Sequence, residues 1–323
     1  MAFPWRLTVA ILAGVTPGLG GAVAIAHPTA ASPASDYVQP PLTKDRLTDE
    51  ALRGLVAEPL AEMLAGDIAD GERDLEALVK ARSGQDGSAT VAAADTLGAM
   101  GILLFAGASD PQNKDLQQKA LTYLRRAIAA TRMAFGADDP EVALALNDYA
   151  TAMINLNPLD PGNDTEADLQ EAYRIRLATL GPLNSETVDV LGELAMVEGL
   201  PPRTGGEPGK IAEVASLFAK AIDGAQHNRA YTPYEVGELY LKISEFWARN
   251  SNPALASDNF ARFEQQLHLV SDDGEQLADT LVFGVIRFAS ALEDSGHKTE
   301  AEVLRKRYAT QITEMVSRAK YTP

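Results

Sequence analysis

The sequence predicts an all-α protein, an α–α superhelix built from about five to six helical hairpins. Its apolar content of 46% comes largely from Ala and Leu, and Val and Ile do not form alternating runs, which favours helices over strands. In addition, the stretch from Ala120 to Ala195 contains two similar helix–loop–helix segments. Similarity at a fixed period is typical of helical repeat arrays, in which each unit buries its apolar face against its neighbours.

The two similar segments share a loop that opens on glycine. The loops are FGADDPEV from Phe135 and LGPLNSET from Leu180, and their glycines lie 45 positions apart. The flanking helices match at the same offset, which predicts that both segments fold in the same way. The matching positions are Ala127 with Ala172, Leu146 with Leu191 and Ala150 with Ala195.

Five hairpins can be aligned from Thr90 onward on a column of small residues in their first helices. A small side chain lets a paired helix approach closely, while larger neighbours on the same face fill the groove. The small column is Gly101, Ala150, Ala195, Ser244 and Ala289, preceded four positions earlier by Leu97, Leu146, Leu191, Tyr240 and Val285 and one position earlier by Met100, Tyr149, Leu194, Ile243 and Phe288. The second helices are anchored at Ala120, Val214, Ala256 and Ala301, while the second copy departs from the pattern with Thr165 where a small apolar residue is expected.

These motifs resemble tetratricopeptide repeats. The loop pattern Gly-x-x-(Asp/Asn)-(Pro/Ser)-Glu, followed by Leu146-Asn147-Asp148-Tyr149-Ala150, is similar to the longer kinesin-light-chain subtype. The last hairpin matches an ordinary repeat at its small, turn and packing positions. The resemblance covers about residues 90 to 315, and the units are longer than the usual repeat of about 34 residues. The last-hairpin positions are Ala289, Gly296, Ala301 and Tyr308.

The N-terminal segment, residues 1–26, resembles a secretory signal peptide. Arg6 supplies the positive charge, and Ala24-Ile25-Ala26 fits the small-x-small rule for cleavage after Ala26. We therefore expect a periplasmic or secreted protein with no membrane insertion after cleavage. The alternative is an uncleaved anchor, because about twenty uncharged residues can span a bilayer.

A proline-rich linker over residues 27–47 is predicted to follow the leader. Residues 48–88 are expected to form a helical pair, either a cap or a degenerate repeat. Its first helix runs to about Ala65, a break falls at Asp70-Gly71, and a second helix covers Glu72 to Arg82. The repeat array then fills residues 89–320, with a possible hinge at 200–209 that is rich in Pro and Gly.

Composition narrows the classes of partner. The formal charge of −17 disfavours nucleic acid and anionic lipid, since both are themselves anionic. The chain has no cysteine, which excludes disulfides, thiolate nucleophiles and cysteine-based metal sites.

No motif in the sequence predicts catalysis, a cofactor or a metal. The four histidines, His27, His227, His268 and His297, are far apart and have no ligand spacing typical of a metal site. No phosphate-binding loop, dinucleotide fingerprint or nucleophile elbow occurs. Glu193 and Glu198 are the one conceivable acid–base pair. We therefore expect a protein that is not an enzyme.

The resemblance implies that the first helices line a concave groove that accepts extended peptides. In the kinesin-light-chain subtype, an Asn of the first helix helps to hold the ligand backbone, and Asn147 matches it. An amide can donate to and accept from a peptide at once, although Asn147 can also serve local capping or packing. The alignment adds six groove positions, Asp148, Thr151, Lys242, Glu245, Arg249 and Arg287.

The leading hypothesis is thus an exported, non-catalytic scaffold that binds a protein or peptide partner in this groove. The alternative is a self-associating structural component of the cell envelope. Aromatic residues near the end of the chain, Phe283, Tyr308 and Tyr321, are candidates for such end-to-end packing.

Overall fold

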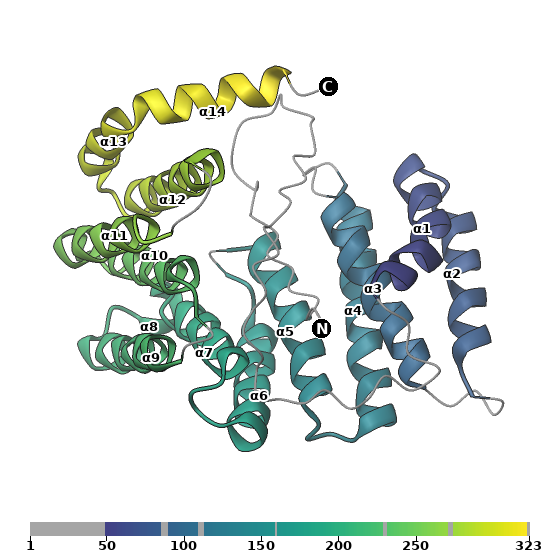
Figure 1. Ribbon diagram of the computed structural model, residues 1–323. Coiled ribbons are helices and arrows are strands. Elements are labelled where there is room, and N and C mark those ends of the chain that lie inside the picture. The colour runs from purple at the N-terminus through teal and green to yellow at the C-terminus, as the bar shows by residue number, and fades with distance from the viewer. Residues whose placement is uncertain are drawn as a thin grey trace. The chain divides into compact units, whose positions relative to one another are not determined.

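The computed structural model describes residues 49–84, 90–108, 113–158, 160–228, 231–270 and 274–321. Within these ranges the chain forms helices α1 to α14 and their connections, with no strand (Figure 1). The predicted all-α fold of helical hairpins is confirmed for these ranges. The expected leader over 1–26 and linker over 27–47 lie outside the described residues. None of the helices in the described ranges is both long and apolar enough to cross a membrane.

The chain divides into two compact units between Thr179 and Leu180, at the end of α6. Unit 1 contains α1 (Asp49–Ala65), α2 (Ile68–Arg82), α3 (Val91–Gly107), α4 (Lys114–Phe135), α5 (Pro140–Leu156) and α6 (Asn163–Leu180). Unit 2 contains α7 (Ser185–Glu198), α8 (Pro201–Thr204), α9 (Pro208–His227), α10 (Pro233–Arg249), α11 (Pro253–Leu267), α12 (Gly274–Asp294), α13 (Lys298–Arg307) and α14 (Ala309–Tyr321).

In unit 1, neighbouring helices pair and the pairs stack. Helix α1 packs on α2 and α3 packs on α4, while α3 also contacts α1, α2 and α5. The second helices are joined at the surface by ion pairs, such as Arg126 of α4 with Glu76 of α2 and Arg132 of α4 with Glu171 of α6. Each repeat therefore uses its neighbours to complete its apolar core and its polar surface.

The N-terminal pair differs from the sequence prediction at Gly71. Helix α2 begins at Ile68, so the break predicted at Asp70-Gly71 was wrong. The turn instead uses Gly66, whose φ of +101° suits glycine. Gly71 lies inside α2 and faces α1, where an added Cβ would come within 2.5 Å of Met63 Cγ and 2.6 Å of the Pro59 carbonyl oxygen. The glycine allows close packing rather than a break.

The two glycine-opening loops form the same structure. Gly136 and Gly181 end helices α4 and α6 with φ of +97° and +81°, a backbone region that favours glycine. Three residues later, the side chains of Asp139 and Asn184 accept hydrogen bonds from the backbone N–H of the second residue of the next helix, both at 2.9 Å. The repeated sequence therefore encodes a helix stop followed by a helix cap.

In unit 2, the first helices α7, α10 and α12 form a row in which α10 contacts both neighbours. Their second helices pair with them, α9 with α7, α11 with α10 and α13 with α12. Helix α10 begins with a capping box in which Thr232 and Glu235 satisfy each other's backbone N–H groups. The position of α10 in the middle of the unit leaves it with packed neighbours on several sides.

The hinge predicted at 200–209 lies inside unit 2, between α7 and α9. Its side chains are held in place: Leu200 is 3% exposed and Thr204 is 1% exposed. The Asn250 side chain, at the end of α10, donates to the Gly199 carbonyl at 2.7 Å and accepts from the Thr204 hydroxyl at 3.1 Å. This segment is bound to α10, and the division between the units falls before it.

The columns of small residues identified in the sequence are buried in the structure. Ala150, Ala195, Ser244 and Ala289 have no exposed surface, and Gly101 is buried as well. The anchors of the second helices are buried too, and so is Thr165. All the remaining repeats have an apolar residue at the position of Thr165. Thr165 satisfies its hydroxyl by donating to the Pro161 carbonyl at 2.6 Å, and this local bond makes a polar residue tolerable in the column.

The glycine of the first repeat offers a test of close helix packing. A Cβ on Gly101 would lie 2.7 Å from Leu124 Cγ and 3.1 Å from the Ala120 carbonyl oxygen, whereas one on Gly98 would meet nothing nearer than 3.9 Å. We expect Gly101→Ala to lower the free energy of unfolding by about 1–3 kcal/mol through overpacking. Gly98→Ala, the matched control in the same helix, should raise it by about 0.5–1 kcal/mol.

Urea unfolding followed by circular dichroism measures both changes. Equal effects of the two substitutions would contradict a close approach of α3 and α4 at Gly101.

Candidate functional site

The predicted groove residues divide between the two units. Asn147, Asp148 and Thr151 lie on α5 of unit 1, and Lys242, Glu245, Arg249 and Arg287 lie on α10 and α12 of unit 2. The structure therefore gives two candidate surfaces, each formed by first helices, and each is described by itself.

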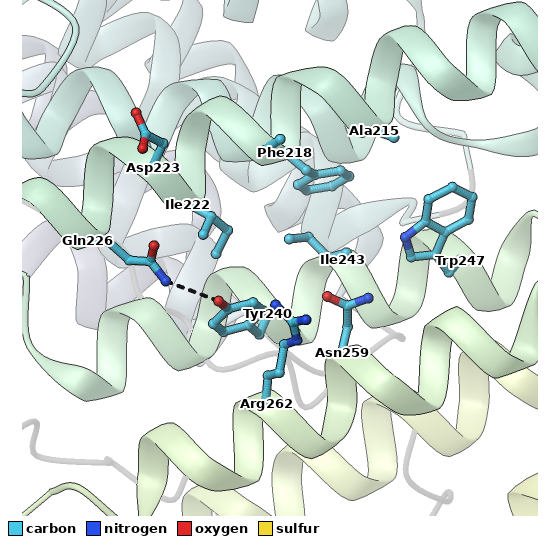
Figure 2. A pocket seen from close by; sticks show the side chains of 11 residues that line it. Ala215, Phe218, Ile222, Asp223, Gln226, Tyr240, Ile243, Trp247, Asn259 and Arg262 are labelled. Atoms are coloured by element: carbon cyan, nitrogen blue, oxygen red, sulfur yellow. Dashed lines mark hydrogen bonds between the residues drawn. The ribbon is translucent and has the colours of Figure 1, made fainter.

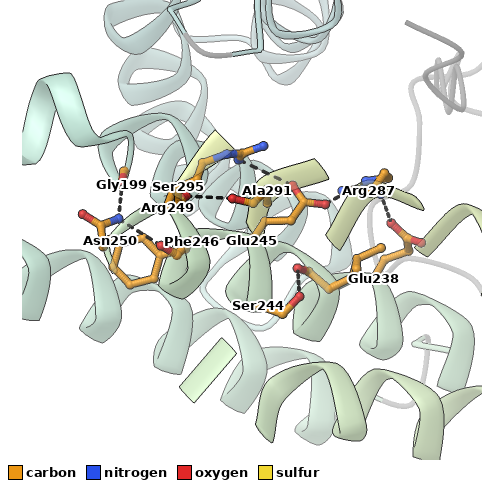
Figure 3. Close-up of polar contacts among 11 residues, drawn as sticks. Gly199, Glu238, Ser244, Glu245, Phe246, Arg249, Asn250, Arg287, Ala291 and Ser295 are labelled. Carbon is orange, nitrogen blue, oxygen red and sulfur yellow. Dashed lines mark hydrogen bonds and ion pairs between the residues drawn. The ribbon is translucent and has the colours of Figure 1, made fainter. Parts of the chain in front are cut away.

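A stripe of charged residues runs along α10. Glu238, Lys242, Glu245 and Arg249 are spaced by four, three and four positions, which places them on one side of a helix with about 3.6 residues per turn. We call these four residues the α10 stripe. The neighbouring first helix α12 contributes Arg287 beside it (Figure 3).

Arg287 connects the stripe to α12 by two ion pairs. Its Nη1 lies 3.0 Å from Glu238 Oε2, and its Nε lies 2.8 Å from Glu245 Oε1. Arg249 Nη1 approaches Glu245 Oε2 at 3.5 Å. Glu245 is thus held between two guanidinium groups in a position where its side chain is only 5% exposed (Figure 3). Removing either partner of such a buried pair is strongly destabilising, because it leaves the other group buried without a counter-charge.

Two neighbouring carboxylates determine the pKa of Arg287. Burial alone would lower the pKa of this guanidinium, but the carboxylates of Glu245 and Glu238 outweigh that effect and raise it above its ordinary value. The pKa of Tyr234, one turn before Glu238, is also raised, first by burial and then by the Glu238 charge. Tyr234 therefore keeps its proton, and the Arg287 group keeps its charge.

Lys242 differs from the other members of the stripe. Its side chain is half-buried, and no carboxylate of the described residues lies within ion-pairing distance of its ammonium group. Glu238 and Glu245, the acids one turn away on either side, are both engaged by Arg287. The stripe thus consists of a fixed ionic cluster with one cation that has no acidic partner in the described parts of the chain.

On α5, the three predicted residues have different surroundings. The Oδ1 atom of Asn147 is buried and has no hydrogen-bond donor within the described residues. Asp148 and Thr151 each take part in interactions inside the protein. Asn147 therefore offers an unused acceptor on the first-helix face, while the other two are already engaged.

An arginine on α4 fixes the position of α5. The guanidinium of Arg125 lies 3.7 Å from the centre of the Tyr149 ring on α5 and 2.7 Å from Asp168 Oδ2 on α6. Burial raises the pKa of Asp168, and the charge of Arg125 opposes this rise. One side chain therefore ties three helices together by a cation–π contact and an ion pair.

Sequence analysis missed Glu238 and Tyr234. Both continue the same helical spacing toward the start of α10, at four and eight positions before Lys242, so the periodicity contained the signal. The pairing of Arg287 with this particular helix could not be read from the sequence. It depends on the stagger of α12 against α10.

The other residues considered for catalysis or metal binding, where the structure describes them, do not come together in a site. Glu193 and Glu198 both lie on α7, but five positions along a helix separate side chains by about 140°, so they do not converge. His227 contacts Asp223 at 3.2 Å and His297 contacts Glu300 at 3.7 Å. Within the described ranges, no three His, Cys, Asp or Glu side chains gather in a way that could hold a metal ion.

Comparisons with known proteins add a likeness at the level of the fold. The sequence matches no protein-family profile and no curated protein. Among solved structures 25 chains match. One is the crystal structure of BtubC (BKLC) from P. vanneervenii, with 14% identity, a TM-score of 0.48, and coverage of 84% of this chain and 94% of that chain. Likeness at this level carries no argument about a site.

The ionic cluster predicts a large stability effect at Arg287. In Arg287→Leu, the buried Glu245 carboxylate keeps only the more distant Arg249, so we expect the free energy of unfolding to fall by about 2–4 kcal/mol. Arg305→Leu is the control, because its pair with Glu293 is 41% and 38% exposed, and its loss should cost less than about 1 kcal/mol.

Adding Glu245→Gln to Arg287→Leu should recover part of the stability, since the neutral amide no longer needs a cation. Chemical unfolding of Arg287→Leu, Glu245→Gln and the double variant, each compared with the parent, gives the coupling energy. Additive effects would show that the two side chains do not form a buried pair.

Proposed function

We propose that the protein is an exported, non-catalytic scaffold that binds a protein or peptide partner through its first-helix faces. The main support is the α10 stripe in unit 2, where charged groups are fixed on the side of α10 toward α12. Helical-repeat folds present faces of this kind to other proteins. A partner with polar side chains can reach Glu238, Lys242 and Arg287 with little further ordering, while Glu245 lies beneath them and holds Arg287 in place.

The fixed geometry of the stripe has an energetic benefit for binding. Long charged side chains normally lose rotamer freedom when a ligand immobilises them. Here Glu238, Glu245 and Arg287 are already held by one another at 2.8–3.0 Å. Lys242, without an acidic partner in the described residues, is left to pair with a carboxylate of the partner.

The repeated loops support a relationship to the longer, kinesin-light-chain-type tetratricopeptide repeats, which we propose as the subtype. In each loop the glycine ends one helix with a positive φ, and the Asp or Asn three positions later caps the next. We further propose that Asn147 takes the ligand-binding role of the subtype's Asn. The support is its Oδ1 atom, which is buried on the α5 face without a donor.

Self-association remains the second candidate, with less support than at first expected. Tyr308, one of the three aromatic residues offered for end-to-end packing, is only 6% exposed because it closes the core at the junction of α13 and α14. Phe283 is half-buried, and the side chain of Tyr321 lies outside the described residues. Light scattering that shows a mass rising with concentration would favour this alternative.

Binding through the stripe is tested by reversing the charge of Lys242. Tagged full-length chains carrying Lys242→Glu, or Lys220→Glu as a control, are expressed in the source cell beside the parent. Lys220 is exposed on the second helix α9, so its reversal changes net charge equally. We expect a partner captured by the parent and by Lys220→Glu to bind Lys242→Glu at least about tenfold more weakly.

Quantitative mass spectrometry of the captured proteins measures this difference. Equal capture by all three chains would show that the α10 stripe is not the binding surface, provided that all three have the same circular dichroism.

Export is tested on the same tagged chain. Cleavage after Ala26 should give a mature protein that starts at His27 and fractionates outside the cytoplasm, because the small residues Ala24 and Ala26 fit the cleavage rule. N-terminal sequencing checks the new end. An intact Met1 end in the cytoplasmic fraction would contradict export, and an intact end in the membrane fraction would favour the anchor.

A further inference from the structure

A pocket of 380 Å³ lies on the second-helix side of unit 2, between α9 and α11, with α10 as its floor (Figure 2). This volume falls within the range of about 300–1,000 Å³ that is usual for ligand sites. Apolar side chains from α9 and α10 form one part of its surface, namely Phe218, Ile222, Ile243 and Trp247. Polar and charged side chains form the rest, including Asp223, Gln226, Asn259 and Arg262. None of the residues predicted for the groove lines this pocket.

The walls of the pocket are held in place by aromatic packing. Phe246 of α10 lies with its ring centre 5.4 Å from that of Phe218 and 4.8 Å from that of Trp247, two residues that line the pocket. On the α9 side, the lining includes Ala215 and Ala219, whose small side chains leave the space open. Gln226 closes one end by donating to the Tyr240 hydroxyl at 3.2 Å (Figure 2).

One cation stands at the rim. The Arg262 guanidinium on α11 lies 5.7 Å from the centre of the Tyr240 ring. Within the described parts of the chain, no carboxylate lies within ion-pairing distance of it. Other second-helix arginines do have such partners: Arg125 with Asp168, Arg126 with Glu76, Arg132 with Glu171, Arg174 with Asp138, Arg305 with Glu293 and Arg307 with Glu264.

Arg262 also borders a second hollow of 490 Å³ that continues along α11. Tyr240 and Arg262 line both spaces, and the second is otherwise bordered mainly by polar residues, Asp258, Gln265 and Gln266. The surface therefore changes from a pocket with a mixed lining to a polar strip, and Arg262 lies where the two spaces meet. Asp223 and Asp258 also border these hollows, but neither lies within ion-pairing distance of the Arg262 guanidinium. Arg262 is therefore the group of this surface that can pair with a carboxylate of a ligand.

We propose that this outer pocket is a second peptide-binding site. Its ligand is a segment in which an aromatic or branched apolar residue lies next to Asp or Glu. The apolar side chain enters the pocket against Ile222, Ile243 and Trp247, and the adjacent carboxylate pairs with Arg262. The polar strip along α11 accommodates the chain that follows. The proposal concerns the opposite side of α10 from the stripe and stands whether or not the stripe binds a partner.

The apolar part of the site is tested by filling the pocket from its rim. Ala219 is exposed and lines the pocket, so Ala219→Trp occupies it without removing a core side chain. Ala212→Trp, on the same helix but outside the pocket, is the matched control. Arg262→Glu removes the cation, and Lys220→Glu again controls for net charge.

A random dodecapeptide library displayed on phage is selected on the full-length chain, and the enriched peptides are synthesised. We expect an apolar residue beside Asp or Glu to be enriched. Affinity should fall at least about tenfold in Ala219→Trp and in Arg262→Glu, and stay unchanged in the two controls. Exchanging the acidic residue of a peptide for Gln or Asn should weaken binding to the parent and leave binding to Arg262→Glu equal or stronger.

Trp247 reports occupancy directly. The chain has two tryptophans, Trp5 and Trp247, so Trp5→Phe leaves one fluorophore, which lines the pocket. Peptide binding should shift its emission, and the shift should be absent in Ala219→Trp after subtraction of the added tryptophan's signal. Selected peptides that bind Ala219→Trp like the parent, or that lack the acidic residue, would overturn the proposal. So would selection that enriches no peptide, given unchanged circular dichroism of the variants.

Discussion

The rest of the structure depends on how closely the helices approach one another at the small residues of each repeat. Even a methyl group at Gly101 would collide with Leu124, and the equivalent alanines and Ser244 have no exposed surface. Because these positions fix the distance between paired helices, they also fix which side chains of neighbouring first helices can meet. The contact of Arg287 with Glu238 and Glu245 is therefore a consequence of the packing at two small residues. Ser244 is next to Glu245 in the chain, and Ala289 lies two positions after Arg287.

Polar interactions act within the frame that this packing provides. Arg125 joins three helices of unit 1 through Tyr149 and Asp168, and Asn250 holds the end of α7 to the end of α10 in unit 2. In both units a side chain with several donors satisfies groups from different helices at once. Such contacts specify an orientation, since each loses its geometry if a helix slides or turns. Alanine side chains alone allow paired helices to slide or rotate against each other. The polar contacts of Arg125 and Asn250 therefore help to fix the positions of the helices and of the side chains on their surfaces.

Periodicity in the sequence was sufficient for the fold class and the buried columns, because these depend on local spacing. It failed at Gly71, where the same residue type serves a turn in one context and close helix contact in another. It placed the hinge among prolines and glycines, although Leu200 and Thr204 are buried. Of the predicted groove, it found Glu245, Arg249 and Arg287 without showing that they form one cluster, and it missed the outer pocket. Those features depend on the offset between helices far apart in the sequence.

Helix α10 has the charged stripe on one side and contributes Tyr240, Ile243 and Trp247 to the pocket on another. Its remaining positions pack against neighbours, including Val236, Leu239, Leu241 and Phe246, all at most 7% exposed. Few of its residues can therefore change without disturbing the core, the stripe or the pocket. The mutational tolerance of the repeats should accordingly be uneven. Among relatives of this protein, α10 should diverge slowly, while exposed second-helix positions such as Lys220 and Val303 vary freely.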